Sequence, residues 1–206
     1  MIKFLVKTIY LSTVLLFSID AFCSEFIEGR DYVVIHESEP NRQVTHFFSF
    51  GCRSCFLVNQ MIKSIEKDSL CSINIEKCHV YTSPFSKYLS KAWVVANQLG
   101  IAEQVDNLLF KGIQNQTITN ESEVKEIFLI AGISEEEFDL WMCHPQIEEH
   151  LKKNFDQVNQ LKISEIPAIV VGNKFLVKLV RFPWNDQQAF AERYQCLVSE
   201  LLEKIS

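Results

Sequence analysis

The sequence has no block of Lys or Arg residues. Its 206 residues include 20 Lys and Arg against 26 Asp and Glu, so the formal net charge is −6 at pH 7. Proteins that bind nucleic acid need clustered basic residues to displace counterions from the phosphates. The charge pattern therefore argues against nucleic acid as a partner.

Long apolar segments are absent beyond the first twenty or so residues. The chain starts with two lysines and an apolar stretch at 9–19, which is too short to span a bilayer comfortably. We expect residues 1–23 to be a secretory signal that is cleaved after Cys23, or alternatively after Ala21. The remaining chain is then expected to be a soluble, exported protein.

Internal repeats and low-complexity tracts are also absent. The chain is 48% hydrophobic and 22% charged, close to the usage of an average globular protein. Such a composition argues against a disordered chain and against a membrane-embedded bundle. The length suits one ordinary domain, or one domain that carries an inserted subdomain.

Cysteine is well represented, with seven residues in the chain. The six that remain after cleavage at Cys23 are Cys52, Cys55, Cys71, Cys78, Cys143 and Cys196. An even number in an exported protein permits disulfides. Cys71 and Cys78 are one possible structural pair. Cys143 and Cys196 are another, and free buried thiols are the alternative for each pair, since nothing in the sequence fixes the pairing.

The CxxC formed by Cys52 and Cys55 follows a segment with near-continuous apolar character. Residues 44–50 are typical of a buried strand, and apolar residues at helical spacing over 57–65 predict an amphipathic helix after the motif. Residues 73–81 alternate well enough for another strand. The pattern predicts a right-handed β-α-β unit with both cysteines at the strand-to-helix junction.

The middle of the chain is predicted to be helical. A short β-rich run at 32–35 precedes the unit described above, whereas 85–151 shows helical periodicity throughout. Thr119 or Asn120 is placed to cap one helix, and Ser134 to cap the next. These signals predict a compact helical block.

The last part of the chain returns to strand patterns. Two short apolar runs at 169–171 and 175–177 flank Gly172-Asn173, which predicts a tight hairpin. Asn185 or Asp186 is placed to cap a closing amphipathic helix.

The CxxC has the chemistry of a switchable disulfide. Cys52 is expected at a helix N-terminus, where free N–H groups and the helix dipole favour a thiolate, so it is the expected nucleophile. Cys55 lies one turn inside the helix and is the expected resolving thiol. Arg53 adds a cation near the Cys52 sulfur unless it only points to water, and Ser54 offers a hydrogen-bond donor.

A permanent disulfide or half of a zinc site is the alternative for this CxxC. Fifteen residues separate Cys55 from Cys71, as in some zinc ribbons. Six residues then separate Cys71 from Cys78, where two are usual in such ribbons. The spacing therefore favours redox chemistry over a metal site.

The dipeptide Ile166-Pro167 is a second candidate element of the site. A proline that enters a strand cannot donate to the ladder, which predicts an edge position or a cis turn. Beside a redox CxxC, a cis Pro167 would leave the backbone of Ile166 free to pair with an extended substrate. An ordinary turn proline is the alternative.

These motifs together resemble the DsbA family of thioredoxin-fold disulfide oxidases over nearly all of the expected mature chain. The segments that carry the similarity are 47–52 with Cys55, 77–80, Ala92-Trp93, 110–114, 128–132 and 166–168. The resemblance implies an α/β thioredoxin fold interrupted by an inserted all-helical domain. It divides the chain into 24–83, the helical insert 84–150, and 151–206.

The resemblance also implies a function that needs no cofactor. A periplasmic protein of this family donates its disulfide, here Cys52–Cys55, to reduced or unfolded exported proteins. A quinone-linked, DsbB-like partner in the inner membrane then reoxidises it. A thiol reductase or isomerase is the first alternative, although the N-terminal dimerisation module common in such proteins is not seen. A non-redox binding or chaperone module, or a metal carrier, is the second.

The sequence departs from the family pattern at the modulators of the site. The commonest dipeptide between the cysteines in the family is Pro-His, whereas here it is Arg53-Ser54. The family often has buried acidic residues on the strand and the first helix, where this chain has His46 and Asn59 with Lys77 retained. His46 is either an altered proton relay or a core histidine.

Overall fold

A computed structural model describes residues 26–35, 41–68 and 75–205 of the chain. The predicted signal at 1–23 and the cysteine at position 71 lie outside the described residues. Within these residues, no helix is long and apolar enough to cross a membrane.

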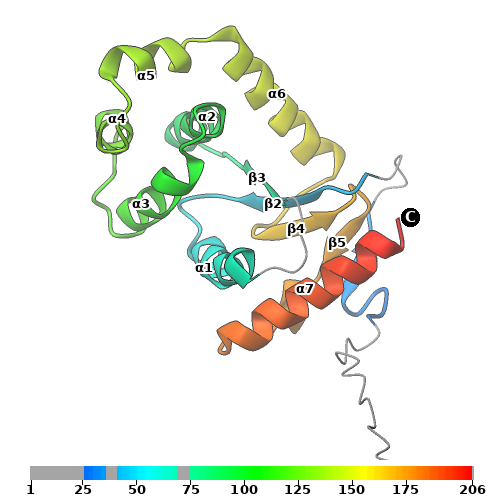
Figure 1. Ribbon diagram of the computed structural model, residues 1–206. Coiled ribbons are helices and arrows are strands. Elements are labelled where there is room, and N and C mark those ends of the chain that lie inside the picture. Colours follow the sequence, from blue (N-terminus) through cyan, green and yellow to red (C-terminus); the bar gives the residue numbers. More distant parts are fainter. Residues whose placement is uncertain (1–25, 36–40, 69–74, 206) are drawn as a thin grey trace, which may run out of the picture.

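Five strands form one mixed sheet in the order β1-β5-β4-β2-β3 (Figure 1). Their bounds are β1 (Tyr32–Val34), β2 (Val44–Phe48), β3 (Ile75–His79), β4 (Ala168–Val171) and β5 (Phe175–Val177). All five residues of β2 are buried, because β2 lies between two other strands and is covered on both faces. The near-continuous apolar character of this segment reflects that position.

The helices of the described residues divide between two sides of the sheet. They are α1 (Arg53–Asp68), α2 (Pro84–Gln98), α3 (Ala102–Gln114), α4 (Glu121–Ile130), α5 (Glu135–Met142), α6 (Pro145–Gln160) and α7 (Gln187–Glu203). In Figure 1, α2 to α5 gather in a block on the side opposite α7, and α6 leads back to the sheet. This arrangement confirms the predicted α/β fold with a helical insertion.

The predicted β-α-β unit is confirmed. Strands β2 and β3 pair in parallel, with Phe47 opposite Cys78, and α1 connects them. Helix α1 packs beside α7, where the ring of Tyr194 belongs to a core that also contains Val44 and Ile169. The unit therefore brings the residues that follow β2 to one end of the sheet.

The predicted hairpin is also confirmed. Strands β4 and β5 pair antiparallel, and both Gly172 and Asn173 have positive φ angles, of 64° and 56°. Two consecutive left-handed residues are what a type I′ turn requires, and the Lys174 N–H closes this turn by donating to the Val171 carbonyl oxygen at 3.1 Å. A Cβ atom on Gly172 would also lie 2.8 Å from the backbone oxygen of Asn41, so the turn favours glycine on both counts.

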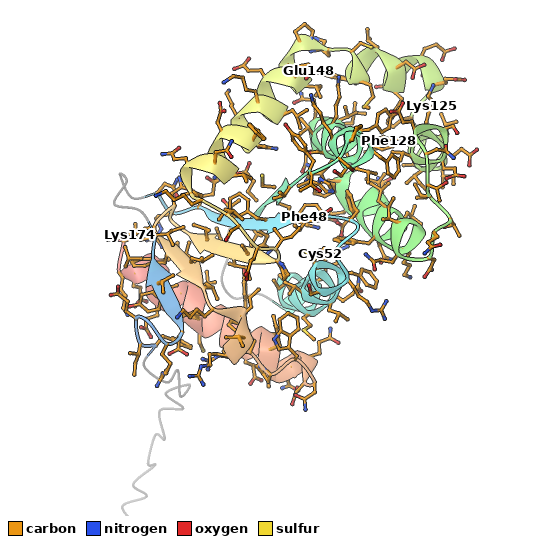
Figure 2. The ribbon with its side chains drawn as sticks, turned by 180° about the vertical axis from the view of Figure 1, so that it is seen from behind. Phe48, Cys52, Lys125, Phe128, Glu148 and Lys174 are labelled. Carbon is orange, nitrogen blue, oxygen red and sulfur yellow. A yellow bond between two sulfur atoms is a disulfide. The ribbon has the colours of Figure 1, made fainter. Side chains whose placement is uncertain are left out.

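The helical block has its own apolar core. Asn120 caps α4 and Ser134 caps α5, as their positions predict. The rings of Phe128 and Phe138 lie 4.7 Å apart within the block, and the buried Phe48 extends the same core to the end of β2 (Figure 2). Helix α6 is continuous across the proposed division between residues 150 and 151. The division of the chain into three segments stays a prediction.

The structural disulfides considered from the sequence are wrong. Cys78 is a buried free thiol, and Cys143 is an exposed free thiol. Cys196 is disulfide-bonded, but not to Cys143. Cys78 lies on β3 and points toward α6, where its sulfur is 4.0 Å from the carbonyl oxygen of Asn154. It is therefore a core residue with no cysteine beside it among the described residues.

The two free thiols are expected to differ widely in reactivity. Burial, reinforced by the nearby Glu76 carboxylate, raises the pKa of Cys78 to about 12, so this thiol is neither accessible nor ionised near pH 7. We expect an alkylating reagent to modify Cys143 in the folded protein and Cys78 only after unfolding. Mass spectrometry of the corresponding peptides measures both rates. Equal labelling of the folded protein at the two positions would contradict the packing of β3 against α6.

Candidate active site

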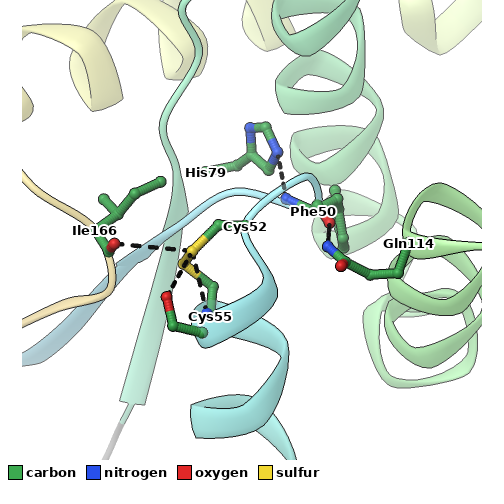
Figure 3. Close-up of a disulfide and its surroundings, with 7 residues drawn as sticks. Phe50, Cys52, Cys55, His79, Gln114 and Ile166 are labelled. Atoms are coloured by element: carbon green, nitrogen blue, oxygen red, sulfur yellow. Dashed lines mark hydrogen bonds between the residues drawn. A yellow bond between two sulfur atoms is a disulfide. The ribbon is translucent and has the colours of Figure 1, made fainter.

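The two cysteines of the CxxC lie at the end of β2 and the beginning of α1. Strand β2 ends at Phe48, and Cys52 directly precedes Arg53, the first residue of α1. Cys52 and Cys55 form a disulfide, with their Cα atoms 5.2 Å apart (Figure 3). The predicted junction is confirmed, and it places Cys52 at a helix N-terminus, where negative charge is favoured.

The two sulfur atoms differ in their access to solvent. Cys55 is 2% exposed and belongs to the apolar core that contains Phe48 and Phe50, whereas Cys52 is only half-buried. The backbone N–H of Cys55 donates a hydrogen bond to the Cys52 sulfur at 3.1 Å. An incoming thiolate therefore meets Cys52 first, and this sulfur already has a hydrogen-bond donor.

The loop before β4 faces the disulfide. The peptide bond between Ile166 and Pro167 is cis, as one of the two sequence-based alternatives predicts. The carbonyl oxygen of Ile166 lies 3.8 Å from the Cys52 sulfur (Figure 3). No described residue forms a backbone hydrogen bond with the N–H of Ile166. The residue whose carbonyl oxygen lies beside the reactive sulfur therefore has a backbone N–H that is free to bond to an extended chain.

A groove of about 530 Å³ opens beside Cys52. Its walls are mainly apolar and come from segments far apart in the sequence. The apolar residues are Val80, Phe85, Leu89, Ile113, Ile163 and Ile166. Serine and threonine residues and Glu165 complete the lining. Such a surface accepts varied side chains, because apolar contact is not directional.

The residues between the cysteines point to solvent. Arg53 is exposed and forms no hydrogen bond or ion pair with any described residue. The hydroxyl of Ser54 lies 3.4 Å from the Cys52 sulfur. The Ser54 hydroxyl is therefore close enough to donate a hydrogen bond to a thiolate at Cys52. Arg53 would act on that thiolate only through the electrostatic field of its positive charge.

We expect Arg53→Ala to make Cys52 of the reduced protein ionise at higher pH, because the variant lacks a cation next to the thiolate. The shift should be small at an exposed site and should shrink with added salt, since the Debye length falls from about 10 Å at 0.1 M to about 3 Å at 1 M. Thiolate absorbance followed across pH measures it. Lys152→Ala, on the exposed face of α6, is the control. Superimposable curves for Arg53→Ala and wild type at low salt would rule out the charge effect.

Lys77 lies in a network of polar groups under the aromatic residues of the site. Its ammonium group donates to Asn59 Oδ1 at 2.8 Å and to Asp106 Oδ1 at 2.5 Å. The same ammonium lies 4.9 Å from the ring centres of both Phe48 and Trp93. The structure thus joins two of the sequence-predicted modulators, Asn59 and Lys77, directly, and both also bond to a third residue.

That third residue, Asp106 on α3, was missed in the sequence. Its side chain is 2% exposed and also pairs with Lys63, at 2.6 Å. Burial alone would raise the pKa of Asp106, but Lys77, Lys63 and the Asn59 amide outweigh this and hold it below its ordinary value. The signal available in the sequence was an acidic residue on the apolar face of a helix, three and four residues before Leu109 and Phe110.

His46 does not join this network by a hydrogen bond. It lies on β2 with 8% exposure, and its Nε2 atom is 2.7 Å from the hydroxyl of Tyr194 on α7. Burial, followed by repulsion from Lys77, lowers the pKa of His46 to about 3, so the ring is neutral near pH 7. His46, Asn59 and Lys77 do line one cavity of about 570 Å³. The geometry favours a core histidine over a proton relay.

Comparison with known sequences gives consistent matches along the chain. A family model described as a DSBA-like thioredoxin domain matches residues 80–195. The thiol:disulfide interchange protein DsbA of Buchnera aphidicola from Acyrthosiphon pisum is 30% identical over 206 residues, which covers 96% of this chain and 97% of that protein. DsbA of Yersinia pestis is 28% identical over 92% of this chain and 93% of its own length.

Solved structures agree with the sequence matches. DsbA of Klebsiella pneumoniae has a TM-score of 0.80 and 25% identity, and the match covers 87% of this chain and 99% of that one. A cysteine-to-serine variant of Proteus mirabilis DsbA, solved with a non-covalently bound peptide, has a TM-score of 0.77 and 27% identity over 87% of this chain and 100% of that one. With a disulfide in CxxC spacing at the matching junction, the chain belongs to the DsbA-like thioredoxin family and is a thiol:disulfide oxidoreductase.

Proposed function

We propose that this protein is an oxidase that donates the Cys52–Cys55 disulfide to reduced, newly exported proteins. The observation that carries the proposal is the asymmetry of the oxidised pair. Cys52 is half-buried beside a mainly apolar groove, whereas Cys55 is 2% exposed behind it. A substrate thiolate is thus directed to one sulfur, and the other is placed to leave.

The proposed exchange has two steps. A substrate thiolate attacks the Cys52 sulfur, the S–S bond breaks, and Cys55 leaves with the electron pair and is then protonated. A second thiolate of the substrate then attacks the substrate sulfur that is bonded to Cys52 in the mixed disulfide. A disulfide forms within the substrate, and Cys52 leaves as a thiolate. The substrate loses two protons and two electrons and gains a disulfide, while the CxxC becomes a dithiol. The Cys55 N–H and the N-terminus of α1 stabilise the Cys52 thiolate.

Substrate binding is proposed to involve the loop before β4. The free backbone N–H of Ile166, whose carbonyl oxygen lies next to the Cys52 sulfur, would pair with the backbone of an extended substrate, and Pro167 would hold this loop in place. The groove beside Cys52 would accept the neighbouring apolar side chains. The peptide bound to the Proteus mirabilis protein supports a peptide ligand for this chain.

Location and reoxidation follow from the same proposal. The chain begins with a basic and apolar segment of the kind that directs export, and the matched relatives are named as thiol:disulfide interchange proteins. We propose a periplasmic location after cleavage of residues 1–23. A quinone-linked, DsbB-like protein of the inner membrane would return the reduced CxxC to the disulfide.

The equilibrium with glutathione tests the direction of the reaction. An oxidase requires a reduction potential above that of protein disulfide isomerase, about −180 mV, whereas a reductase is expected near the value of thioredoxin, about −270 mV. The fraction of oxidised protein is measured by thiol labelling across ratios of reduced to oxidised glutathione. A potential in the thioredoxin range would overturn the oxidase and favour a reductase.

A further inference from the structure

The backbone of Phe50 is buried where the sheet has already ended. The last contact in line with the ladder is the Val80 N–H, which donates to the Phe48 carbonyl at 2.7 Å. Phe50 lies two residues farther on and is 0% exposed. A buried N–H and a buried C=O both need partners, and neither can be supplied by a strand at this point.

Two side chains bind the two polar groups of Phe50. The Phe50 N–H donates to Nε2 of His79 at 3.1 Å, and Nε2 of Gln114 donates to the Phe50 carbonyl oxygen at 2.7 Å (Figure 3). His79 is the last residue of β3, and Gln114 is the last residue of α3. The loop before Cys52 is thus held from the sheet on one side and from the helical block on the other.

The hydrogen bond fixes the protonation state of His79. Because Nε2 accepts, the ring is neutral and its proton is on Nδ1, which has no partner among the described residues. The ring centres of His79 and Phe50 lie 5.0 Å apart, and a second hydrogen bond, from the Ser90 hydroxyl to the His79 carbonyl at 2.9 Å, anchors the end of β3. Burial, with Lys77 nearby, lowers the pKa of His79 to about 3, so the acceptor persists at neutral pH.

We propose that His79 and Gln114 are positioning residues of the redox centre, which hold Phe50 so that Cys52 stays between the Ile166 carbonyl and the N-terminus of α1. Gly51 connects Phe50 to Cys52; it is exposed and has only the Ser49 hydroxyl, at 3.9 Å, near a potential Cβ. The Cys52 N–H donates to the Ser49 carbonyl oxygen at 3.0 Å, so the position of Cys52 follows that of the loop. A glycine cannot fix the loop by its own packing. Once the disulfide is reduced, the two hydrogen bonds remain as constraints on the loop.

The proposal rests on reversible exchange at the CxxC but not on its direction in the cell. In the reduced protein, a Cys52 thiolate is stabilised by the Cys55 N–H and the start of α1 only while it stays close to them. Release of Phe50 would let Cys52 move, and the reduced form would lose stability. Two molecules of reduced glutathione convert the protein disulfide to a dithiol and leave one molecule of oxidised glutathione. Because the reduced form would be less stable, the equilibrium with glutathione would shift toward the oxidised protein.

Gln114→Glu tests the proposal at nearly constant side-chain shape. The variant replaces the amide donor with a carboxylate, which repels the Phe50 carbonyl oxygen. We expect the glutathione equilibrium to move toward the oxidised protein and the reaction with a cysteine-containing peptide to slow by roughly tenfold, since displaced reacting groups lose rate steeply. His79→Phe, which lacks an acceptor, is expected to act in the same direction. His79→Gln restores an acceptor near the position of Nε2 and is expected to recover most of the rate.

The controls separate positioning from simple loss of stability. Gln98→Glu makes the same change at an exposed position on α2 and is expected to leave equilibrium and rate at wild-type values. Thermal unfolding is recorded for every variant. A folded Gln114→Glu protein with wild-type equilibrium and rate would overturn the proposal, even if it melts at lower temperature. If His79→Phe does not fold, the comparison of Gln114→Glu with wild type still tests the proposal. A wild-type reduction potential in the thioredoxin range would overturn only the proposed oxidase function. The comparison of Gln114→Glu with wild type would remain a valid test of positioning.

Discussion

The Cys52→Ser variant is expected to lose all dithiol–disulfide exchange, whereas Cys55→Ser is expected to react once and then stop. Without the Cys52 sulfur, no accessible atom of the pair can form a mixed disulfide, and Cys55 is 2% exposed. In Cys55→Ser, the Cys52 thiolate attacks oxidised glutathione, one glutathione thiolate leaves, and the mixed disulfide has no neighbouring thiol to resolve it.

Mass spectrometry after an acid quench measures the adduct directly. Reduced Cys55→Ser protein should gain one glutathione and keep it, whereas wild-type protein should pass to the Cys52–Cys55 disulfide. All variants are made on a Cys143→Ser background, because this exposed free thiol at the end of α5 lies outside the site and can itself take up glutathione. Equal adduct formation by the Cys52→Ser and Cys55→Ser variants would show that the assignment of the nucleophile is wrong.

Asp106→Asn is expected to lower the free energy of unfolding by about 2–4 kcal/mol, since it removes a buried carboxylate that pairs with two partly buried cations. The Asp106 side chain is 2% exposed, while those of Lys77 and Lys63 are 20% and 33% exposed. Their contact with solvent places the effect below that of a fully buried pair. Urea unfolding at neutral pH measures the change.

The same variant has a predicted pH dependence. The pKa of Asp106 is lower in the folded protein than in the unfolded chain, because Lys77, Lys63 and Asn59 favour the charged form. Its stabilising contribution is therefore complete above the unfolded value of about 3.9 and is lost as pH falls through the folded value. The difference between wild type and Asp106→Asn should thus be largest near neutral pH and shrink below about pH 4.

An exposed ion pair provides the matched control. Asp139 pairs with Lys125 at 2.8 Å, but its side chain is 55% exposed. Asp139→Asn should change the free energy of unfolding by no more than about 0.5 kcal/mol. Adding Lys77→Met to Asp106→Asn should recover part of the loss, because one of the two cations that pair with Asp106 is then removed as well. Equal effects of the two Asp→Asn changes would contradict a buried network under the active site.

Local sequence patterns determined most of the fold and the centre of the site. The apolar run before Cys52, the helical spacing after it and the turn at Gly172-Asn173 each encode an element through residues that are neighbours in the chain. Capping by Asn120 and Ser134 likewise depends on backbone groups within one turn. The CxxC and the proline at the start of a strand identified the reactive pair and the loop that faces it for the same reason.

Only the tertiary structure decided which distant residues meet. The sequence left open whether Cys78 and Cys143 form disulfides or are free thiols, and in the folded chain both are free. Asp106 on α3 meets Asn59 and Lys63 of α1 and Lys77 of β3 through side chains, a relation between distant segments that no periodicity encodes. His79 and Gln114 meet at one buried peptide group for a similar reason. Buried polar groups need hydrogen-bond or ion-pair partners, and the tertiary structure determines which residues lie close enough to be those partners.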